Sequence, residues 1–132
     1  MRRRLEEARV ARLATVDPAG RPHLVPVVFA LVDDLIVSAV DEKPKRTQRL
    51  QRLENMRVNP LVTVLVDHYD EDWSRLWWVR VRGEAEVHVE GPQWDRALEA
   101  LADKYQQYRD QRPQGPAILI EAQDWLGWSA AG

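Results

Sequence analysis

Basic side chains gather around the start of one predicted helix, where they could bind an anion. Residues 45–57 are good helix formers, and Pro44 suits a first helical position, where its missing N–H costs nothing. At about 100° per residue, Lys45, Arg49 and Arg52 lie beside the apolar stripe of this helix rather than opposite it. The amino end of a helix attracts anions through free N–H groups and the macrodipole. The pattern therefore indicates a possible phosphate or carboxylate site.

The same helix has an apolar face that predicts how it packs. Leu50, Leu53 and Met56 form the stripe that should face the body of the protein. The opposite face is predicted to carry polar residues: Thr47, Gln51, Glu54 and Asn55. Long basic side chains also line the edges of core helices with no ligand involved, because their stems pack while their charges reach water. The spacing alone leaves both interpretations open.

The length and composition of the chain narrow the possible functions. The 132 residues fit one domain, 1–132. The net charge of −2 gives no general attraction to nucleic acid or acidic membranes. There is no cysteine, which excludes disulfides, thiolate catalysis and zinc–thiolate sites. No apolar run reaches the roughly 18 residues that span a membrane, and a cytoplasmic location is expected.

Most familiar catalytic motifs are missing from the chain. Neither glycine-rich phosphate loop is present, and there is no G-x-S-x-G nucleophile elbow. His23, His68 and His88 are not paired at metal-ligand spacing, so we expect no metal site from them. A group of carboxylates in one loop is interpreted as solvated rather than calcium-binding, because it lacks the spacing of a calcium loop: Asp67, Asp70, Glu71 and Asp72.

Short apolar runs alternate with turns along most of the chain. Six strands are predicted, at 10–16, 22–31, 35–40, 61–67, 76–90 and 117–122. Helices are predicted at 45–57 and 92–109, with a further turn or two at 2–9. Short turns join the first three strands, which a parallel sheet does not allow. The predicted fold is mainly β with helices (α+β), a small six-stranded antiparallel barrel with two or three helices.

Two features of the predicted strands refine this picture. Residues 76–90 alternate between apolar and charged side chains over a long stretch, so one face of this strand is buried. Gly83 in its middle indicates a bulge or bend. Pro26 cannot donate a backbone hydrogen bond, so its strand should lie at an edge or contain a bulge.

An anion site, a barrel and six tryptophans suit a flat cofactor that carries phosphate. Tryptophan is enriched in ring-binding pockets and at subunit interfaces. A cofactor that carries hydride needs no protein nucleophile, because the protein supplies position, electrostatics and water exclusion. The missing catalytic motifs are therefore compatible with an oxidoreductase.

Several blocks of sequence resemble a known family. They are ARLATVDPAGRPHLVPVVFAL, KPKRTQRL, VNPLVTVLVDHYDEDWSRLWWVRVRGEAEV and the final GW, in this order over essentially the whole chain. The chain resembles the split-barrel, pyridoxamine-phosphate-oxidase-like flavin and deazaflavin proteins. Within them it is similar to the actinobacterial branch thought to use coenzyme F420. The resemblance implies an FMN-binding-like split β-barrel and a homodimer with the cofactor at its interface.

The resemblance also implies which residues hold the cofactor. The cofactor phosphate would lie against Lys43, Lys45, Arg46 and Thr47, with Arg52 as a rival of Arg46 for the main contact. Beside the ring would lie Pro26 and Val27 on one strand, together with the edge strand around Ser38 and Ala39. The partner subunit would add Trp73, Trp77, Trp78 and Arg80, and Trp128 would cover the ring.

The implied function is hydride transfer from F420 to a small, unsaturated organic substrate, with no protein residue in a catalytic role. Residues 23–28 contain no Lys or Arg, whereas flavin-using members carry a basic pair there, so the deazaflavin is favoured over FMN. Two alternatives stay open: a non-enzymatic flavin- or deazaflavin-binding protein and an FMN-dependent oxidase. No nucleic-acid or membrane partner is expected.

Overall fold

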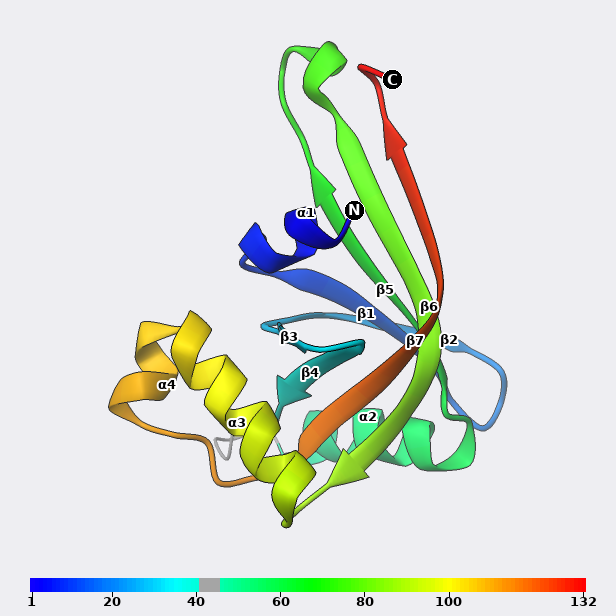
Figure 1. Cartoon of the computed structure of the whole chain (residues 1–132). Helices are drawn as coiled ribbons and strands as arrows, with labels where there is room; N and C mark the ends of the chain where they lie inside the picture. Colours follow the sequence, from blue (N-terminus) through cyan, green and yellow to red (C-terminus); the bar gives the residue numbers. More distant parts are fainter. Residues whose placement is uncertain (41–45) are drawn as a thin grey trace.

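Seven strands in the described part of the chain form a single, strongly curved antiparallel sheet (Figure 1). The computed structural model describes the backbone of residues 1–40 and 46–132, and the side chains of these residues except 46–50. The strand order is β2-β1-β5-β6-β7-β4-β3. The strands are β1 (Ala11–Val16), β2 (Pro22–Val27), β3 (Ala30–Val32), β4 (Leu35–Ala39), β5 (Leu61–His68), β6 (Trp77–His88) and β7 (Ala117–Ser129). The sheet is not closed, since β2 and β3 are its edges, which corrects the predicted six-stranded barrel.

The seventh strand arises because the predicted strand 22–31 is two strands at opposite edges of the sheet. Val28 and Phe29 form the link between β2 and β3. The Tyr105 hydroxyl accepts a hydrogen bond from Phe29 N at 3.1 Å and lies 3.0 Å from Phe29 O. The Tyr105 side chain therefore pairs with the backbone N–H and C=O of Phe29, which a neighbouring strand would otherwise do. The chain can leave the strand here, and the Phe29 ring stays fully buried.

Four α-helices and one 3₁₀ turn accompany the sheet in the described part of the chain, more than the two or three predicted. They are α1 (Arg2–Glu7), α2 (Arg46–Val58), η1 (Trp73–Arg75), α3 (Pro92–Lys104) and α4 (Gln106–Asp110). The predicted helix 92–109 is divided because Tyr105 is extended, with φ −118° and ψ 123°. Among the described residues, no helix has the length and apolar character needed to cross a membrane.

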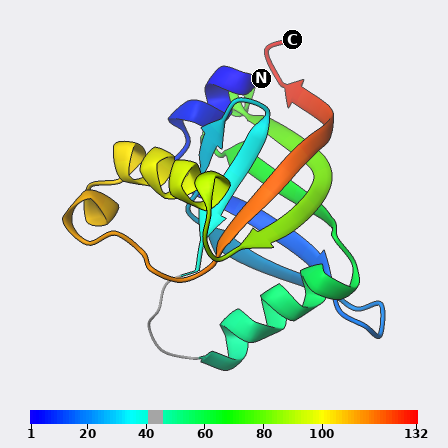
Figure 2. The same cartoon turned by 60° about the horizontal axis from the view of Figure 1, so that its bottom comes forward.

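The main core fills the inside of the curved sheet, with α1 and α2 at its two ends (Figures 1 and 2). Leu5 of α1 and Met56 of α2 are buried in it against valines of the central strands. This confirms the inward face of the predicted basic helix at Leu53 and Met56, while the Leu50 side chain lies outside the described residues.

One polar residue of α2 is buried, contrary to the prediction. Asn55 was expected on the outer face of the helix but is completely enclosed. Its Nδ2 donates to Thr15 Oγ1 at 3.1 Å, and its Oδ1 accepts from Gln51 Nε2 at 2.7 Å. The hydrogen bonds offset the cost of desolvating the amide. The bond from Asn55 to Thr15 connects α2 to β1.

A second core lies on the outer surface of the sheet, where α3 and α4 cover β3, β4 and the first half of β7. Leu98 and Leu101 of α3 are fully buried against Val37 and Leu119. The strand β4 is therefore covered on both faces and lies between β7 and β3. The expectation that Ser38 and Ala39 lie on an edge strand is wrong.

A bulge interrupts the pairing of β6 with β7. The register of β6 with β7 shifts between Arg82 and Gly83, as predicted at Gly83, and leaves Gln123 unpaired. A Cβ on Gly83 would collide with the backbone oxygen of Glu121 and lie 3.0 Å from Ile120 Cγ2. Because of this bulge, β7 continues to Ser129 instead of ending near Ala122 as predicted.

Candidate functional site

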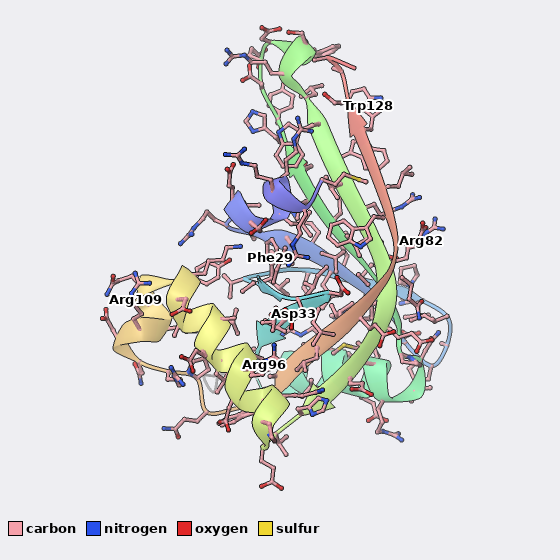
Figure 3. All side chains as sticks on the ribbon, in the orientation of Figure 1. Phe29, Asp33, Arg82, Arg96, Arg109 and Trp128 are labelled. Carbon is pink, nitrogen blue, oxygen red and sulfur yellow. The ribbon has the colours of Figure 1, made fainter. Side chains whose placement is uncertain are left out.

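One broad face of the sheet carries no helix in the described part of the chain. It consists of the outward side chains of β2, β1, β5, β6 and the second half of β7, and is called the open face here. Leu24 is 67% exposed on it, Leu61 55% and Trp128 45%. Figure 3 shows Arg82 and Trp128 on the side of the sheet away from α3. Large exposed apolar side chains make the open face a candidate interaction surface.

Two rows of side chains cross the open face in register. One row runs through Pro26, Arg12, Leu65, Arg80 and Leu126. The next row runs through Leu24, Ala14, Thr63, Arg82 and Asp124, and its last two members form an ion pair at 3.9 Å. The face therefore mixes apolar side chains with cations.

Two indoles and a guanidinium meet at one end of the open face. Trp78 lies directly opposite Trp128 in the β6–β7 register. The Arg80 guanidinium carbon is 5.9 Å from the centre of the Trp78 ring, at the outer limit of a cation–π contact. Arg80 Nε is buried without a hydrogen-bond partner among the described residues. The structure thus brings Trp78, Arg80 and Trp128 together, and leaves one donor of the arginine unsatisfied.

A groove of about 550 Å³ opens on the same face, one row further along. It lies where β1, β2, β5, β6 and β7 meet, and its lining includes Ala14, Val16, Leu61, Thr63 and Arg82. Its volume falls in the range of small-molecule sites, about 300–1,000 Å³. Sequence reasoning missed these residues. The period-two alternation of the strands was the available signal, but it identifies an outward face without saying that the face is hollow.

Trp77 and Trp73 do not join Trp78 on the open face. Trp77 lies on the inner side of the sheet, packed against the main core. Its ring stacks on His68 with centroids 6.0 Å apart, and the Arg4 guanidinium lies 4.6 Å from the ring centre. Trp73 is 67% exposed on η1, with Nε1 3.4 Å from the Tyr69 hydroxyl. Adjacent residues of a strand point to opposite faces, so Trp77 and Trp78 lie on opposite faces of their strand.

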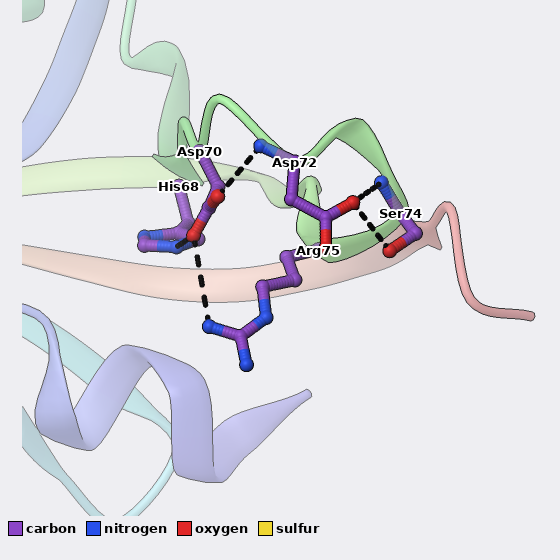
Figure 4. Close-up of polar contacts among 5 residues, drawn as sticks. All are labelled: His68, Asp70, Asp72, Ser74 and Arg75. Atoms are coloured by element: carbon purple, nitrogen blue, oxygen red, sulfur yellow. Dashed lines mark hydrogen bonds and ion pairs between the residues drawn. The ribbon is translucent and has the colours of Figure 1, made fainter.

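The carboxylates of the loop around η1 form hydrogen bonds and ion pairs with neighbouring residues of the same loop (Figure 4). Asp70 accepts from Asp72 N at 2.8 Å and lies 3.7 Å from His68 Nε2 and 4.0 Å from Arg75. Asp72 accepts from Ser74 Oγ at 2.7 Å and from Ser74 N, and these hydrogen bonds lower the pKa of Asp72. Within the described ranges, no three His, Asp or Glu side chains are grouped as metal ligands. These contacts shape the loop.

The predicted ring-binding residues of β2 and β4 lie close together. Pro26 is exposed on β2, which confirms its prediction as part of an edge strand, and Val27 is half-buried against the main core. Ser38 Oγ donates to Val28 O at 2.7 Å and so joins the ends of the two strands. Ser38 and Ala39 are buried in this chain. The structure therefore links Ser38 to Val28, the residue that follows β2, and Pro26 is the exposed member of the four.

Arg52 is the one predicted phosphate-binding side chain that falls within the described residues. It is half-buried on α2, and its Nε is enclosed without a hydrogen-bond partner among them. Burial lowers the pKa of the Arg52 guanidinium, and Tyr108 of α4 opposes that shift. Tyr108 belongs to the second core together with Ala39. A desolvated cation with an unused donor near the end of β4 is suited to binding an anion.

Lys43 and Lys45 lie outside the described residues, as do the side chains of Arg46, Thr47 and Arg49.

The two ends of β6 lie far apart in the molecule. Its carboxyl end lies near α2, while its amino end with Trp77 and Trp78 extends to the far end of the molecule (Figure 1). A single chain thus keeps the indole group apart from Arg52.

The chain as a whole matches one protein family. Residues 1–129 match the pyridoxamine 5'-phosphate oxidase family. The protein belongs to this family. The match covers the sheet, all the helices and both parts of the predicted site. Among curated proteins, none matches the sequence.

Similar solved structures share the fold of this family member. A conserved hypothetical protein from Mycobacterium tuberculosis is 23% identical with a TM-score of 0.77, covering 96% of this chain and 80% of that one. An FAD-binding protein from Mesorhizobium loti is 24% identical, with a TM-score of 0.72 and coverage of 96% and 89%. The heme storage protein HutZ from Vibrio cholerae is 14% identical, with a TM-score of 0.74 and coverage of 97% and 90%. At these identities the likeness concerns the fold alone.

Proposed function

We propose that this member of the pyridoxamine 5'-phosphate oxidase family is an oxidoreductase that uses coenzyme F420. It transfers hydride to a small, flat, unsaturated organic substrate. The observation that carries the proposal is Arg52, a half-buried cation whose Nε has no hydrogen-bond partner among the described residues. A phosphate group satisfies such a guanidinium better than water does, because both charge and hydrogen bonds are complementary.

The choice of a deazaflavin depends on β2. This strand, Pro22–Val27, contains no Lys or Arg, so it offers no cation to a second anionic group beside the ring. The family fold and the FAD-binding protein from Mesorhizobium loti support a flavin-type ring in general. When bound, such a ring supplies the hydride chemistry. The residues of this chain hold its phosphate through Arg52 and the basic segment at Lys43, Lys45, Arg46 and Thr47.

The protein acts as a homodimer in this proposal, joined through the open face. The exposed Leu24, Leu61 and Leu126 give that face the apolar area that a second copy would bury. The partner would bring its Trp78, Arg80 and Trp128 towards the half-site at Arg52. Within one chain the indoles lie apart from Arg52, which is the reason that two copies are needed. The indoles exclude water from the ring and Arg80 offers its free donor to an anionic group.

Binding is tested by titrating the purified protein with F420 and, separately, with FMN, while cofactor fluorescence is followed. Quenching by F420 in the micromolar range and weaker binding of FMN are expected. Arg52→Gln should weaken F420 binding by about ten- to hundred-fold, the value of one charge-assisted hydrogen bond of roughly 1.5–3 kcal/mol. The double variant Lys45→Ala/Arg46→Ala should weaken it further.

Arg57→Gln is the matched control for this titration. Arg57 lies on the same helix, but its side chain is exposed and paired with Glu54 at 2.6 Å, so its loss should leave affinity unchanged. Equal effects of the Arg52 and Arg57 variants would refute the phosphate assignment. Absence of F420 binding at tens of micromolar would remove the cofactor proposal as a whole.

The second candidate function is that of a non-enzymatic binding protein. The likeness in fold to the heme storage protein HutZ supports this candidate. The two are separated by mixing the protein with chemically reduced F420 and a panel of unsaturated acceptors. Faster reoxidation with at least one acceptor is expected of a reductase. Tight binding with no turnover of any acceptor would favour the carrier, and a yellow protein with bound FMN would favour an FMN oxidase.

A further inference from the structure

The carboxyl end of β6 has a free edge. β5 begins at Leu61, which lies opposite Glu84, so residues 85–88 of β6 have a neighbouring strand only on the β7 side. In the described part of the chain, no strand occupies the position in which β5 would otherwise continue. The side of residues 85–88 that faces away from β7 is called the β6 edge here. An unpaired edge of this kind can accept one more strand.

Three backbone groups of the β6 edge lack a partner. Ala85 N donates to Pro60 O at 2.8 Å, so the N–H and C=O of Ala85 point away from β7. Residues two apart in a strand direct these groups to the same side, and those of Val87 therefore point the same way. Pro60 has no N–H to donate to Ala85 O. Ala85 O, Val87 N and Val87 O thus form no backbone hydrogen bond within the described residues.

A groove of about 490 Å³ lies beside the β6 edge, between it and the end of α2. Four apolar residues line it: Met56, Pro60, Ala85 and Val87. Val87 is 39% exposed there. Arg57 also lines the groove but is paired with Glu54 at 2.6 Å. The groove therefore offers an apolar floor next to the unpaired backbone groups.

The β6 edge differs from the edge of the sheet at β2. The β2 edge carries Pro22 and Pro26, which have no N–H to donate to a further strand. Residues 85–88 contain no proline. Donors and acceptors at strand spacing are matched by another extended polypeptide, whose main chain carries the same groups. This backbone pattern identifies the occupant of the groove as a peptide segment.

The side chains around the β6 edge indicate the composition of that segment. Ala85 and Val87 are on the inner, apolar side of the strand, so side chains that enter the groove should be small and apolar. Glu84 and Glu86 are exposed on the outer side, and His88 Nε2 lies 3.1 Å from Glu86 Oε1. Opposite charges on neighbouring strands stabilise their pairing. The outer side therefore favours basic residues.

We propose that the β6 edge binds an extended segment of a partner protein in which small apolar and basic residues alternate. The segment adds an antiparallel strand to the sheet, in line with β5. The residue opposite Val87 donates to Val87 O and accepts from Val87 N. Apolar side chains enter the groove beside Met56, and basic side chains lie outside it next to Glu86. The proposed cofactor plays no part in this binding.

Amide hydrogen exchange at Val87 tests the edge and its occupation. The isotope-labelled full chain is studied by NMR, alone and with a capped hexapeptide that alternates lysine and valine. In the protein alone, Val87 N–H should exchange at least about ten-fold faster than Glu86 N–H, which faces β7. Millimolar peptide should slow the exchange at Val87 several-fold. Slow exchange at Val87 in the protein alone would show that a second copy already covers the edge and would overturn the proposal, as would a peptide without effect.

Two methylated peptides separate strand addition from general attraction. Methyl groups on the amide nitrogens of all the valines block the bonds to the β6 edge, because in the antiparallel arrangement these amides face Val87. This peptide should not slow the exchange. Methyl groups on the lysine amides, which face away from β6, should change the effect by less than about two-fold. Equal behaviour of the two peptides would rule out an added strand.

Glu86→Lys tests the charge preference. Glu86 is exposed, so the variant should fold normally. It should bind the lysine–valine peptide about three- to ten-fold more weakly, and bind a glutamate–valine peptide more tightly by a similar factor. Glu71→Lys makes the same charge change at the opposite end of β6 and should leave both affinities unchanged. An unaltered preference in Glu86→Lys would contradict the proposed basic segment.

Discussion

The Tyr105 hydroxyl is the residue-scale feature on which the strand arrangement most depends. It lies within hydrogen-bond distance of Phe29 N, Phe29 O and Arg9 O. No pattern along the sequence points to this role, because a tyrosine on a predicted helix looks like an ordinary core residue. The break between β2 and β3 follows from a contact 76 residues away in the chain.

Replacing this hydroxyl should therefore be costly. Tyr105→Phe keeps the ring but leaves buried backbone groups of Phe29 unpaired, and we expect a loss of about 2–3 kcal/mol in the free energy of unfolding. Urea denaturation monitored by circular dichroism measures it. Tyr69→Phe, at an exposed tyrosine, should cost under about 0.5 kcal/mol. Equal losses in the two variants would show that the hydroxyl is not the support of this link.

Lys104 makes stability depend on pH in a defined window. Its pKa is about 8 in the folded protein, because burial and the nearby Arg9 disfavour the charged amine, and is ordinary in the unfolded chain. Between pH 8 and 10 the unfolded chain binds more protons, so the free energy of unfolding rises with pH. Because Lys104 is only partly buried, the slope should stay well below the roughly 1.4 kcal/mol per pH unit of one full proton. Above pH 10, ionisation of Tyr105 in the unfolded chain opposes the gain.

Lys104→Met checks the origin of this rise. Methionine keeps an apolar stem beside Phe29 but cannot titrate, so the rise between pH 8 and 10 should disappear in urea denaturation curves. An unchanged slope in this variant would assign the pH dependence to another group. The variant should also be slightly more stable at pH 7, where the wild-type amine is charged.

At the scale of elements, Gly83 permits β6 and β7 to approach closely, because it carries no side chain. Alanine there would collide with the backbone oxygen of Glu121, which cannot move without disturbing the bulge. Gly83→Ala should lower the free energy of unfolding by about 2 kcal/mol, measured by urea denaturation. Gly127→Ala is the matched control: its new Cβ would meet the flexible Met1 side chain, and the loss should stay below about 1 kcal/mol.

The elements that could be predicted are those whose burial pattern is local. Residues 76–90 alternate clearly, and β6 occupies Trp77–His88. The C-terminal strand was cut short because the phase of its alternation changes at Gln123, so a single pattern no longer describes it. Asn55 was placed on the wrong face because its partner, Thr15, lies 40 residues away. Tertiary hydrogen bonds of this kind leave no periodic signal.

The candidate site was predicted in parts for a similar reason. The grouping of Trp78 with Arg80 follows from a two-residue period, and the approach of the β2 and β4 ends follows from the resemblance. The groove at Leu61 and Thr63 was missed, because hollowness depends on curvature across five strands. The basic segment at Lys43 and Lys45 stays a prediction.

For the whole molecule, the open face decides the state of assembly that we propose. Leu24→Glu should place a charge within the buried interface and convert the dimer to a monomer of 15.3 kDa, which light scattering during gel filtration would detect. The monomer should stay folded, since Leu24 is largely exposed in a single chain. It should also lose F420 binding, because the two half-sites no longer meet.

Val89→Glu is the control for this variant. Val89 is equally exposed, at 63%, but lies beyond the end of β6 and outside the open face. Dimerisation and cofactor binding should both survive this change. A wild-type protein that is monomeric at micromolar concentration would contradict the proposed assembly directly.

The unpaired Gln123 divides β7 into two parts whose inward side chains follow different phases of the sequence. Before it, Ile118 and Ile120 point inward, and after it the inward side chain is Trp125, while Leu126 and Trp128 point outward. If Gln123 paired with Arg82 instead of bulging out, every later residue would move one position along β6 and change face. The tryptophan now embedded in hydrocarbon would emerge, and the exposed leucine and tryptophan would turn inside. A single residue without a partner thus keeps the two faces of the C-terminal arm apart.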